Sequence, residues 1–567
     1  MKTTRSRTPS GDISDDDEPK TYMFNGKSYD SYEEMVKAKR QRNQDVLASS
    51  GLLGAKAAID NAFLEQKAAK AASRGLKRAK VKQEPLPRRK SSRLQGVSAP
   101  GIYVEHELAA GKVVVAGGMY TPDEKEEDSK FFNDRVNDGS DLTVTEATEL
   151  CGPKWNKEGT TEAAEQFMQQ SLPEITKEYS SITSPMKGSP NSVRCVPGKS
   201  KIDAIINLNA MSLDSESCVA KVTPERIYSV ACHPNPNHIV ACAGDKRGYV
   251  GIWNVDQYGV EGKKEDESST DGVHLFKPFN GAVNSMTWNQ SGTSLFAASY
   301  DGSVRSFDVE KQVFSEIFAT YNDDDIYKDK IGYNLDGGYK SWVQCLELDH
   351  RFDSGECFFL STSEGSVMHV DLRGKGKVTF DRTLSERKIN SVSLHPNGYT
   401  LATAGLSTVV QLWDVRKMSA STNKKAKPLA WQNSGKSINS AFFSPTGKRL
   451  LTTTMMDHID ILVDAHLASG LIKTPKTRIN HDNRTGRWLS TFMARWHPGT
   501  FSGEEIFVTG SMKKPRAIEV FGDNGSLLRE ISGEALTAVA SRCCFHPSTK
   551  ELIVIGGNSS GRLTVAR

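Results

Sequence analysis

A dense run of cations between Arg74 and Gly96 is the first chemical signal in this chain of 567 residues. The run reads RGLKRAKVKQEPLPRRKSSRLQG, contains a single acid, Glu84, and is broken by Pro85 and Pro87. Such runs neutralise nucleic-acid phosphates or act as nuclear-import signals, and the alternative is a merely solvated charged tract. Its basic residues after Arg74 are Lys77, Arg78, Lys80, Lys82, Arg88, Arg89, Lys90 and Arg93.

A second set of cations, with two tryptophans among them, falls in short turn-like segments of the C-terminal part. Cations at this density suit a phosphate backbone, and an aromatic ring among them can stack on an unpaired or flipped base. Two alternatives stay open: the tryptophans cap strands in the core, and each cation is a solvated loop charge or the partner of an aspartate. The set is Lys246, Arg247, Lys340, Trp342, Lys388, Arg484, Arg487, Trp488, Lys513, Lys514 and Arg516.

Catalytic and metal-binding motifs are missing from the sequence. There is no G-x-x-x-x-G-K-[ST] loop and no H-E-x-x-H, and the nine cysteines are scattered without a C-x-x-C pair. Histidines precede proline at one repeated position, which indicates turn residues rather than catalytic bases. We therefore expect no enzyme, no cofactor, no metal and no small-molecule substrate.

Apolar residues never form a run of about 18, so we expect no membrane span. The first residues, MKTTRSRTPSGD, lack the apolar core of a secretory signal. Scattered cysteines are typical of buried thiols in a reducing compartment. The sequence thus indicates a cytosolic or nuclear protein.

One repeated unit organises the C-terminal part and is clearest at residues 388–416, KINSVSLHPNGYTLATAGLSTVVQLWDVR. Alternating apolar residues broken by Pro, Gly and Asn predict three short antiparallel strands with tight turns. The unit recurs seven times at spacings mostly near 50 residues, which predicts an all-β, seven-bladed β-propeller over residues 216–567. The last unit stops after its third strand, so we expect residues 218–222 to supply the fourth and close the ring.

The N-terminal part differs in composition. We expect residues 1–100 to form a basic, mostly disordered arm with a helical segment at about 31–72. Residues 101–215 are expected to be an acidic and Ser/Pro-rich linker in which 161–172 could be a short helix. The predicted fold is therefore a propeller preceded by a largely disordered, partly helical region.

The propeller predicts where the loop cations gather. Loops between successive blades lie on the same face as loops between the second and third strands of each blade. All the cations of the second set fall in these two classes of loop, where they outnumber acids such as Asp245, Asp301, Glu364 and Glu386. We therefore expect a ring of positive charge on one face.

The Trp413-Asp414 dipeptide and the turn pattern resemble WD-repeat proteins, although most blades lack the dipeptide. The stretches RTGRWLSTFMARWHP, GGNSSGRLTV and YEEMVKAKRQRNQDVLASSGL are more specific and resemble the WD repeat-containing protein 76 family. These are nuclear WD-repeat proteins linked to DNA damage and chromatin. The resemblance implies nuclear localisation, binding to DNA with a preference for damaged or modified duplex, and chromatin proteins as partners.

Two successive blades carry an Asp-x-Arg at the end of the third strand, on the face opposite the cations. They are Asp371-Leu372-Arg373 and Asp414-Val415-Arg416. Paired boxes of this kind resemble those by which WD-repeat substrate receptors dock on the adaptor of Cullin-4 ubiquitin ligases. A plain structural Asp–Arg pair is the alternative. The second functional hypothesis is thus a ligase substrate receptor or chromatin scaffold.

Overall fold

A computed structural model describes part of the chain, and it separates residues 1–115 from residues 116–567 as two compact units. The described residues are 22–24, 27–29, 34, 37–38, 41–42, 136–155, 160–182, 208, 211, 213, 218–257, 272–320, 341–352, 355–374, 377–420, 426–474, 476–500, 504–547 and 552–567. The whole basic arm and Lys340 lie outside them, so the expectations for those residues stay predictions. In the first unit, β1 (Tyr22–Phe24) and β2 (Lys27–Tyr29) form a hairpin that the sequence did not indicate. The described residues between 34 and 42 are helical, as the sequence predicts for that part of the segment.

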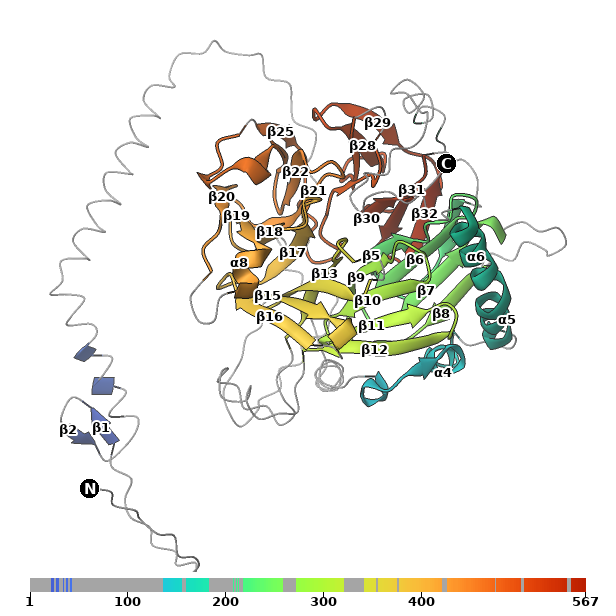
Figure 1. Ribbon diagram of the computed structural model, residues 1–567, viewed down its shortest axis with the longest axis horizontal. Coiled ribbons are helices and arrows are strands. Elements are labelled where there is room, and N and C mark those ends of the chain that lie inside the picture. The colour runs from blue at the N-terminus through green and yellow to red at the C-terminus, as the bar shows by residue number, and fades with distance from the viewer. Residues whose placement is uncertain are drawn as a thin grey trace, which may run out of the picture. The chain divides into compact units, whose positions relative to one another are not determined.

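The second unit is the predicted all-β propeller of seven four-stranded blades (Figure 1). Its first three blades are β5 (Ile227–Cys232), β6 (Val240–Asp245), β7 (Val250–Asn254) and β8 (Val273–Phe276); β9 (Val283–Trp288), β10 (Ser294–Ser299), β11 (Ser303–Asp308) and β12 (Val313–Ala319); and β13 (Val343–Leu348), β14 (Cys357–Thr362), β15 (Ser366–Asp371) and β16 (Lys377–Thr383). The next two are β17 (Ile389–Leu394), β18 (Thr400–Gly405), β19 (Val409–Asp414) and β20 (Ala430–Asn433), and β21 (Ile438–Phe443), β22 (Arg449–Thr454), β23 (His458–Val463) and β25 (Lys476–Asn480). The last two are β26 (Arg495–Trp496), β27 (Ile506–Gly510), β28 (Ile518–Gly522) and β29 (Leu527–Ile531), and β30 (Ala540–Phe545), β31 (Val554–Asn558), β32 (Arg562–Ala566) and β4 (Val219–Lys221).

Ring closure follows the prediction, because β4 is the fourth strand of the last blade. It pairs antiparallel with β32, with Ala220 opposite Leu563. Apolar side chains pack between neighbouring blades, as where Phe296 of the second blade joins Phe358 and Leu360 of the third. The ring therefore has no open first or last blade, and the burial of each blade depends on the next.

The histidines of the His-Pro turns link neighbouring blades. His395 is buried, accepts the backbone N–H of Asn397 at Nδ1 (2.9 Å) and donates from Nε2 to the carbonyl of Gly447 in the next blade (3.1 Å). His233 repeats this arrangement with Asn235 and Gly292. Both ring nitrogens form hydrogen bonds with the backbone, which explains why histidine recurs at this position.

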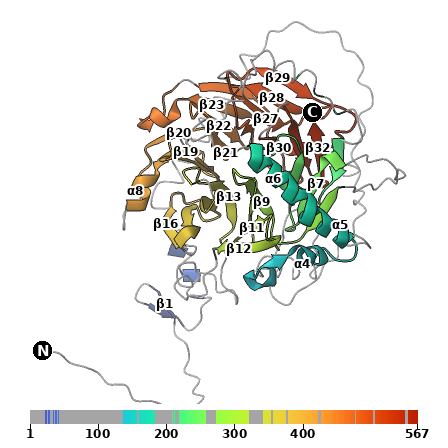
Figure 2. The same ribbon diagram turned by 45° about the vertical axis from the view of Figure 1, so that its right-hand side comes forward.

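Residues 136–182 correct the expectation that 101–215 is only a linker, because they fold onto the propeller (Figure 2). This segment contains η2 (Val136–Gly139), β3 (Leu142–Thr143), α4 (Val144–Glu149), α5 (Thr160–Gln166), the π-helical turn η3 (Phe167–Ser171) and α6 (Leu172–Ile182). β3 extends the second blade beside β12, and Phe167 stacks on His274 of the first blade (4.5 Å between ring centroids). The helical stretch is longer than predicted, and its apolar face is stabilised by the propeller, which the local sequence does not reveal.

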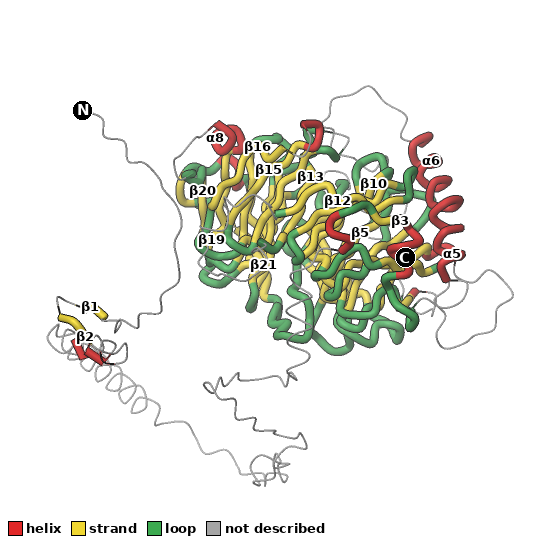
Figure 3. Tube along the Cα trace, turned by 90° about the horizontal axis from the view of Figure 1, so that it is seen from below, coloured by secondary structure: helices red, strands yellow, loops and turns green. Residues whose placement is uncertain are grey.

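Several short helices and one short strand lie at the rim of the ring, where Figure 3 shows helices and loops around the strands. They are η5 (Val255–Gln257), η7 (Leu372–Gly374), α8 (Val415–Ala420), η8 (Ala465–Leu467) and β24 (Gly470–Leu471). β24 pairs in parallel with β20. Among the residues that the structure describes, no helix is long and apolar enough to cross a membrane.

Candidate nucleic-acid interface

The loops that precede the inner strands and those between second and third strands form one face of the propeller, here called the basic face. Its described cations include Arg226, Lys246, Arg247, Arg387, Lys388, Lys436, Arg484, Arg487, Lys513, Lys514, Arg516 and Arg562. The aspartates that the sequence placed among them do not offset them at the surface. Asp245 and Asp301 are 0% and 1% exposed. The acids exposed on this face lie in other loops and include Glu386, Asp457 and Asp482.

Asp245 shapes the turn that carries Lys246 and Arg247. Its carboxylate accepts the backbone N–H groups of Arg247 (2.8 Å), Tyr249 (3.0 Å) and Glu225 (3.1 Å). Burial nevertheless raises the pKa of this carboxyl to about 6. Lys246 and Arg247 remain exposed beyond the turn. Such a buried acceptor holds two cations toward solvent in a fixed loop.

The segment 481–494, between the fifth and sixth blades, reaches across to the first blade. Arg226 of the first blade donates from Nη1 to the carbonyl of Arg487 (2.5 Å), and the Ser490 hydroxyl donates to the carbonyl of Ile227 (2.5 Å). These contacts fix the segment on the basic face and leave the Trp488 side chain 85% exposed. The alternative that Trp488 caps a strand in the core is therefore wrong.

Trp342 occupies a different environment. It is 39% exposed and stacks on Tyr300, with ring centroids 5.4 Å apart and planes 18° apart. One ring face is thus already covered by the protein. Trp488 is the better placed of the two tryptophans to receive a base.

The cations of the β27–β28 loop differ in how far their charge is compensated. The Lys513 ammonium lies 2.9 Å from Glu519 and 2.8 Å from Glu530, which raises its pKa. Arg516 donates to the carbonyls of Met512 (2.9 Å) and Lys513 (3.3 Å) and so holds the loop. Lys514 is exposed. Of the three, Lys514 presents its charge most openly to an incoming phosphate.

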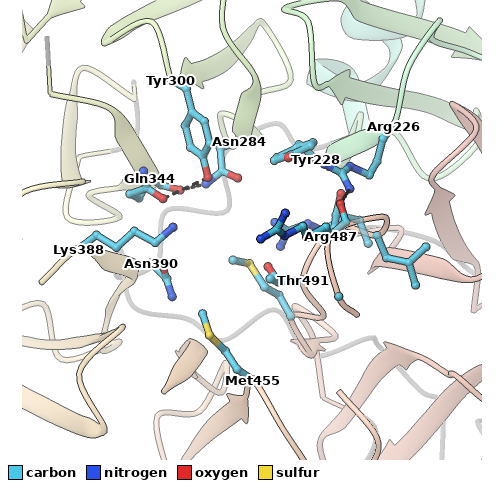
Figure 4. Close-up of a pocket in the computed structure, with 15 residues that line it drawn as sticks. Arg226, Tyr228, Asn284, Tyr300, Gln344, Lys388, Asn390, Met455, Arg487 and Thr491 are labelled. Carbon is cyan, nitrogen blue, oxygen red and sulfur yellow. Dashed lines mark hydrogen bonds between the residues drawn. The ribbon is translucent and has the colours of Figure 1, made fainter. Parts of the chain in front are cut away.

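An axial cavity of about 290 Å³ opens among the inner strands, and the sequence reasoning missed it (Figure 4). Amide side chains line it because the second residue of an inner strand sits in a β-bulge, as at Gln344 and Asn390. A bulge re-aims its side chain, here toward the axis. The detectable signal was the repeated triplet Val-Asn-Ser or Ile-Asn-Ser at 283–285, 389–391 and 438–440. Lys388, which the sequence placed on the cationic face, also lines this cavity.

The two Asp-x-Arg boxes adopt the same geometry on the opposite face. Arg373 donates to both carboxylate oxygens of Asp371 (2.9 and 2.7 Å), and Arg416 does so to Asp414 (3.0 and 2.9 Å). Each guanidinium also lies over an aromatic ring: Phe352 for Arg373 at 4.1 Å and Tyr399 for Arg416 at 4.2 Å. The hydrogen bonds from the arginines lower the pKa of both carboxyls. Both arginines are therefore held in place while exposing 47% and 64% of their side chains.

Metal chemistry has no candidate centre in the described ranges, where no group of three His, Cys, Asp or Glu could hold an ion. The arrangement offers surfaces for binding: a basic face with an exposed tryptophan, and an opposite face with two fixed arginines. Seven closed blades with this repeat define a WD-repeat β-propeller protein.

Comparison with known proteins agrees with this class. The family described as WD domain, G-beta repeat matches residues 273–308 and 378–414. WD repeat-containing protein 76 of Xenopus laevis is 34% identical over 403 residues, which cover 70% of this chain and 61% of the relative. The DNA damage-binding protein CMR1 of Phaeosphaeria nodorum is 27% identical over 555 residues, or 94% of this chain and 98% of the relative. WD repeat-containing protein 76 of Mus musculus is 31% identical over 365 residues, or 63% of this chain and 52% of the relative.

The chain is therefore a WD-repeat protein related to the WD repeat-containing protein 76 family, and the resemblance predicted from the sequence is confirmed. It spans 61% of the length of the frog relative and 52% of the mouse relative.

Proposed function

We propose that this chain is a nuclear DNA-binding protein that engages DNA through the basic face and prefers duplexes with damaged or unpaired bases. The observation that carries the proposal is the segment 481–494. It presents Trp488 at 85% exposure directly after the exposed Arg487 and four residues after the exposed Arg484, and it is fixed to the first blade by two hydrogen bonds. Cations positioned on phosphates with an aromatic ring beside them suit a distorted site in which a base is unstacked. The names of the CMR1 relatives, DNA damage-binding proteins, support this proposal.

The basic arm fits the same role. Its residues, from Lys77 to Arg93, would add phosphate contacts without base selectivity and would serve nuclear import. No catalytic step is part of this proposal, and the chain acts by binding.

The test is a salt titration of DNA binding by the full-length protein. In the double variant Arg484→Glu/Arg487→Glu, we expect affinity for a duplex to fall at least tenfold at about 0.1 M salt. The slope of log Kd against log salt concentration should fall by about 2, because two phosphate contacts are lost. The matched control is Lys417→Glu/Lys448→Glu, which changes the net charge equally at exposed positions on the opposite face. Equal losses in the two variants would show that only net charge matters.

The preference for damaged DNA is tested with Trp488→Ala. We expect this variant to keep most of its affinity for intact duplex and to lose about 1–3 kcal/mol on a duplex with an unpaired base, the usual contribution of one stacked base. An unchanged ratio of the two affinities would remove Trp488 from the proposed site.

A second function is supported by the paired Asp-x-Arg boxes: docking on the adaptor of a Cullin-4 ubiquitin ligase, with the chain as substrate receptor or chromatin scaffold. Two neighbouring blades hold an arginine by the same bidentate pair over an aromatic ring, on the face away from the proposed DNA. This repetition favours one partner that contacts both blades. Fixed arginines are common at the energetic centres of protein interfaces.

For this docking, the double variant Arg373→Ala/Arg416→Ala should bind the purified adaptor at least 30-fold more weakly, since two interface arginines each contribute about 1–2 kcal/mol or more. Its affinity for DNA should stay unchanged. Lys417→Ala, next to Arg416 but outside the boxes, is the control. The docking proposal fails if the double variant binds the adaptor as the unaltered chain does, or if neither binds.

A further inference from the structure

The axial cavity contains cations and no carboxylate. Its lining side chains come from the inner strands, the loop around Tyr300 and the segment 481–494, and they include no Asp or Glu. Figure 4 shows Lys388, Tyr300 and Met455 directed toward its centre from three different blades. The charged residues that line it are Arg226, Lys388, Arg487 and Arg542.

Arg542 is the residue that makes this cavity unusual. It lies on the inner strand β30, is only 7% exposed, and its Nε has no hydrogen-bond partner among the described residues. No acidic side chain within the described ranges forms an ion pair with it. Burial lowers the pKa of this guanidinium to about 10. A buried charge without a counter-charge is costly, so it is expected where a ligand supplies the opposite charge.

Lys388 strengthens this charge instead of balancing it. It precedes β17, and both its burial and the positive charge of Arg542 lower its pKa. Two cations that repel one another in a partly buried cavity attract a doubly charged anion more strongly than a singly charged one. A phosphate monoester carries about −1.5 to −2 at neutral pH, whereas a carboxylate carries −1. The charge pattern therefore favours phosphate over an acidic peptide.

Neutral groups around the two cations can complete the coordination. Gln344 is buried and its Nε2 lacks a hydrogen-bond partner among the described residues, so it remains available as a donor. Its Oε1 accepts the Tyr300 hydroxyl (3.2 Å), which fixes the amide in this orientation. Asn390 donates to the carbonyl of Ile438 (2.8 Å) and is likewise fixed. These side chains are preorganised on the scaffold before any ligand arrives.

We propose that the axial cavity binds a phosphate monoester, with Arg542 and Lys388 as its charged ligands and Gln344 as a neutral donor. A cavity of about 290 Å³ admits one phosphate or one nucleotide, but not a duplex, whose major groove alone is about 12 Å wide. The phosphate is therefore carried by a free nucleotide or by the end of a DNA strand. In the second case the inference rests on the proposed DNA-binding function, and it adds recognition of strand ends to it.

The experiment uses the full-length protein and pairs of single-stranded oligonucleotides that differ only in a 5′-phosphate or a 5′-hydroxyl, with a second pair for the 3′ end. We expect one phosphorylated end to bind at least tenfold more tightly than its hydroxyl counterpart. Arg542→Met replaces the guanidinium by a shorter, uncharged and unbranched side chain, and it should reduce that ratio to about one. Affinity for the hydroxyl-ended strand should change less than twofold, because the other cations of the basic face remain.

Binding of small ligands is examined separately, by thermal unfolding of the protein with inorganic phosphate and with the free nucleotide dAMP. A rise in Tm with dAMP, absent in Arg542→Met, together with no preference between strand ends, would assign the site to a free nucleotide. Lys388→Met is the second variant if Arg542→Met does not fold. The inference is overturned if phosphorylated ends bind no more tightly than hydroxyl ends and dAMP does not raise the Tm. It is also overturned if either effect persists in both Arg542→Met and Lys388→Met. Failure of the proposed DNA function looks different, because all oligonucleotides would then fail to bind.

Discussion

Replacing Gly510 with alanine is expected to destabilise the propeller by about 3 kcal/mol, at the upper end of the cost of overpacking a core. Gly510 ends β27, and a Cβ atom there would lie 1.8 Å from the carbonyl oxygen of Ala540 on the inner strand of the next blade. That neighbour is backbone, so the clash can be relieved only by moving one blade against the other. The measurement is the midpoint of urea unfolding of the full-length protein.

The matched control for Gly510 is Gly522→Ala. Gly522 ends β28 in the same blade, and its nearest neighbour would be the side-chain oxygen of the exposed Asn524 at 3.2 Å, a milder contact with the end of a side chain and not with backbone. We expect this variant to lose less than about 1 kcal/mol. Equal unfolding midpoints for the two variants would contradict the close approach between blades.

Lowering the pH from 7 to 5 is the second change with a large expected effect on stability. Burial lowers the pKa of His233, His395, His497 and His546 to about 4, against an ordinary value of 6.5. Between these values the unfolded chain binds protons that the folded chain does not. The stabilisation is therefore fully present above about pH 6.5 and is lost as the pH falls toward 4. Each imidazole should contribute about 2 kcal/mol to the loss between pH 7 and 5.

Two buried carboxyls act in the opposite direction. Burial raises the pKa of Asp245 to about 6 and that of Glu347 to about 7, so both release protons on unfolding and favour the folded chain as the pH falls. The effect of one histidine is therefore measured by difference. In His395→Asn, the free energy of unfolding should depend on pH less steeply, by about 2 kcal/mol between pH 7 and 5. Parallel curves for the variant and the unaltered chain would show that His395 does not contribute.

The sequence predicted the scaffold well, because each blade is encoded locally. The turn at His395-Pro396, the apolar alternation around it and the small residue at Gly405 recur with a regular period, and this period determines the blade count and the closing strand. The propeller also sorts its loops by face, so the positions of Lys246 and Arg416 on opposite faces followed from strand order. The small residue at the end of the second strand was visible as a pattern. Its reason was not visible: a Cβ at Gly405 would meet the carbonyl oxygen of Lys388 beside the inner strand of the same blade, and one at Gly510 would meet that of Ala540 in the next blade.

The functional surfaces depended more on tertiary contacts. From the sequence alone, Lys513 and Trp488 were equivalent members of the predicted DNA-binding set. Only the fold shows that Glu519 and Glu530 compensate the lysine and that the tryptophan is exposed. The helices of residues 136–182 likewise lacked a visible partner, because the surface that stabilises them belongs to blades far away in the sequence.

The amino-acid sequence by itself determined the repeat, the ring of blades and the two opposed sets of charges, because periodicity and loop order are properties of neighbouring residues. Tertiary structure alone decided which charges are compensated by acids and which line the axial cavity. Arg542 stands in an apolar strand with nothing nearby in the sequence to mark it, and its lack of a counter-charge appears only when the blades surround it. Burial and pairing are set by residues from several blades at once, which local patterns do not encode.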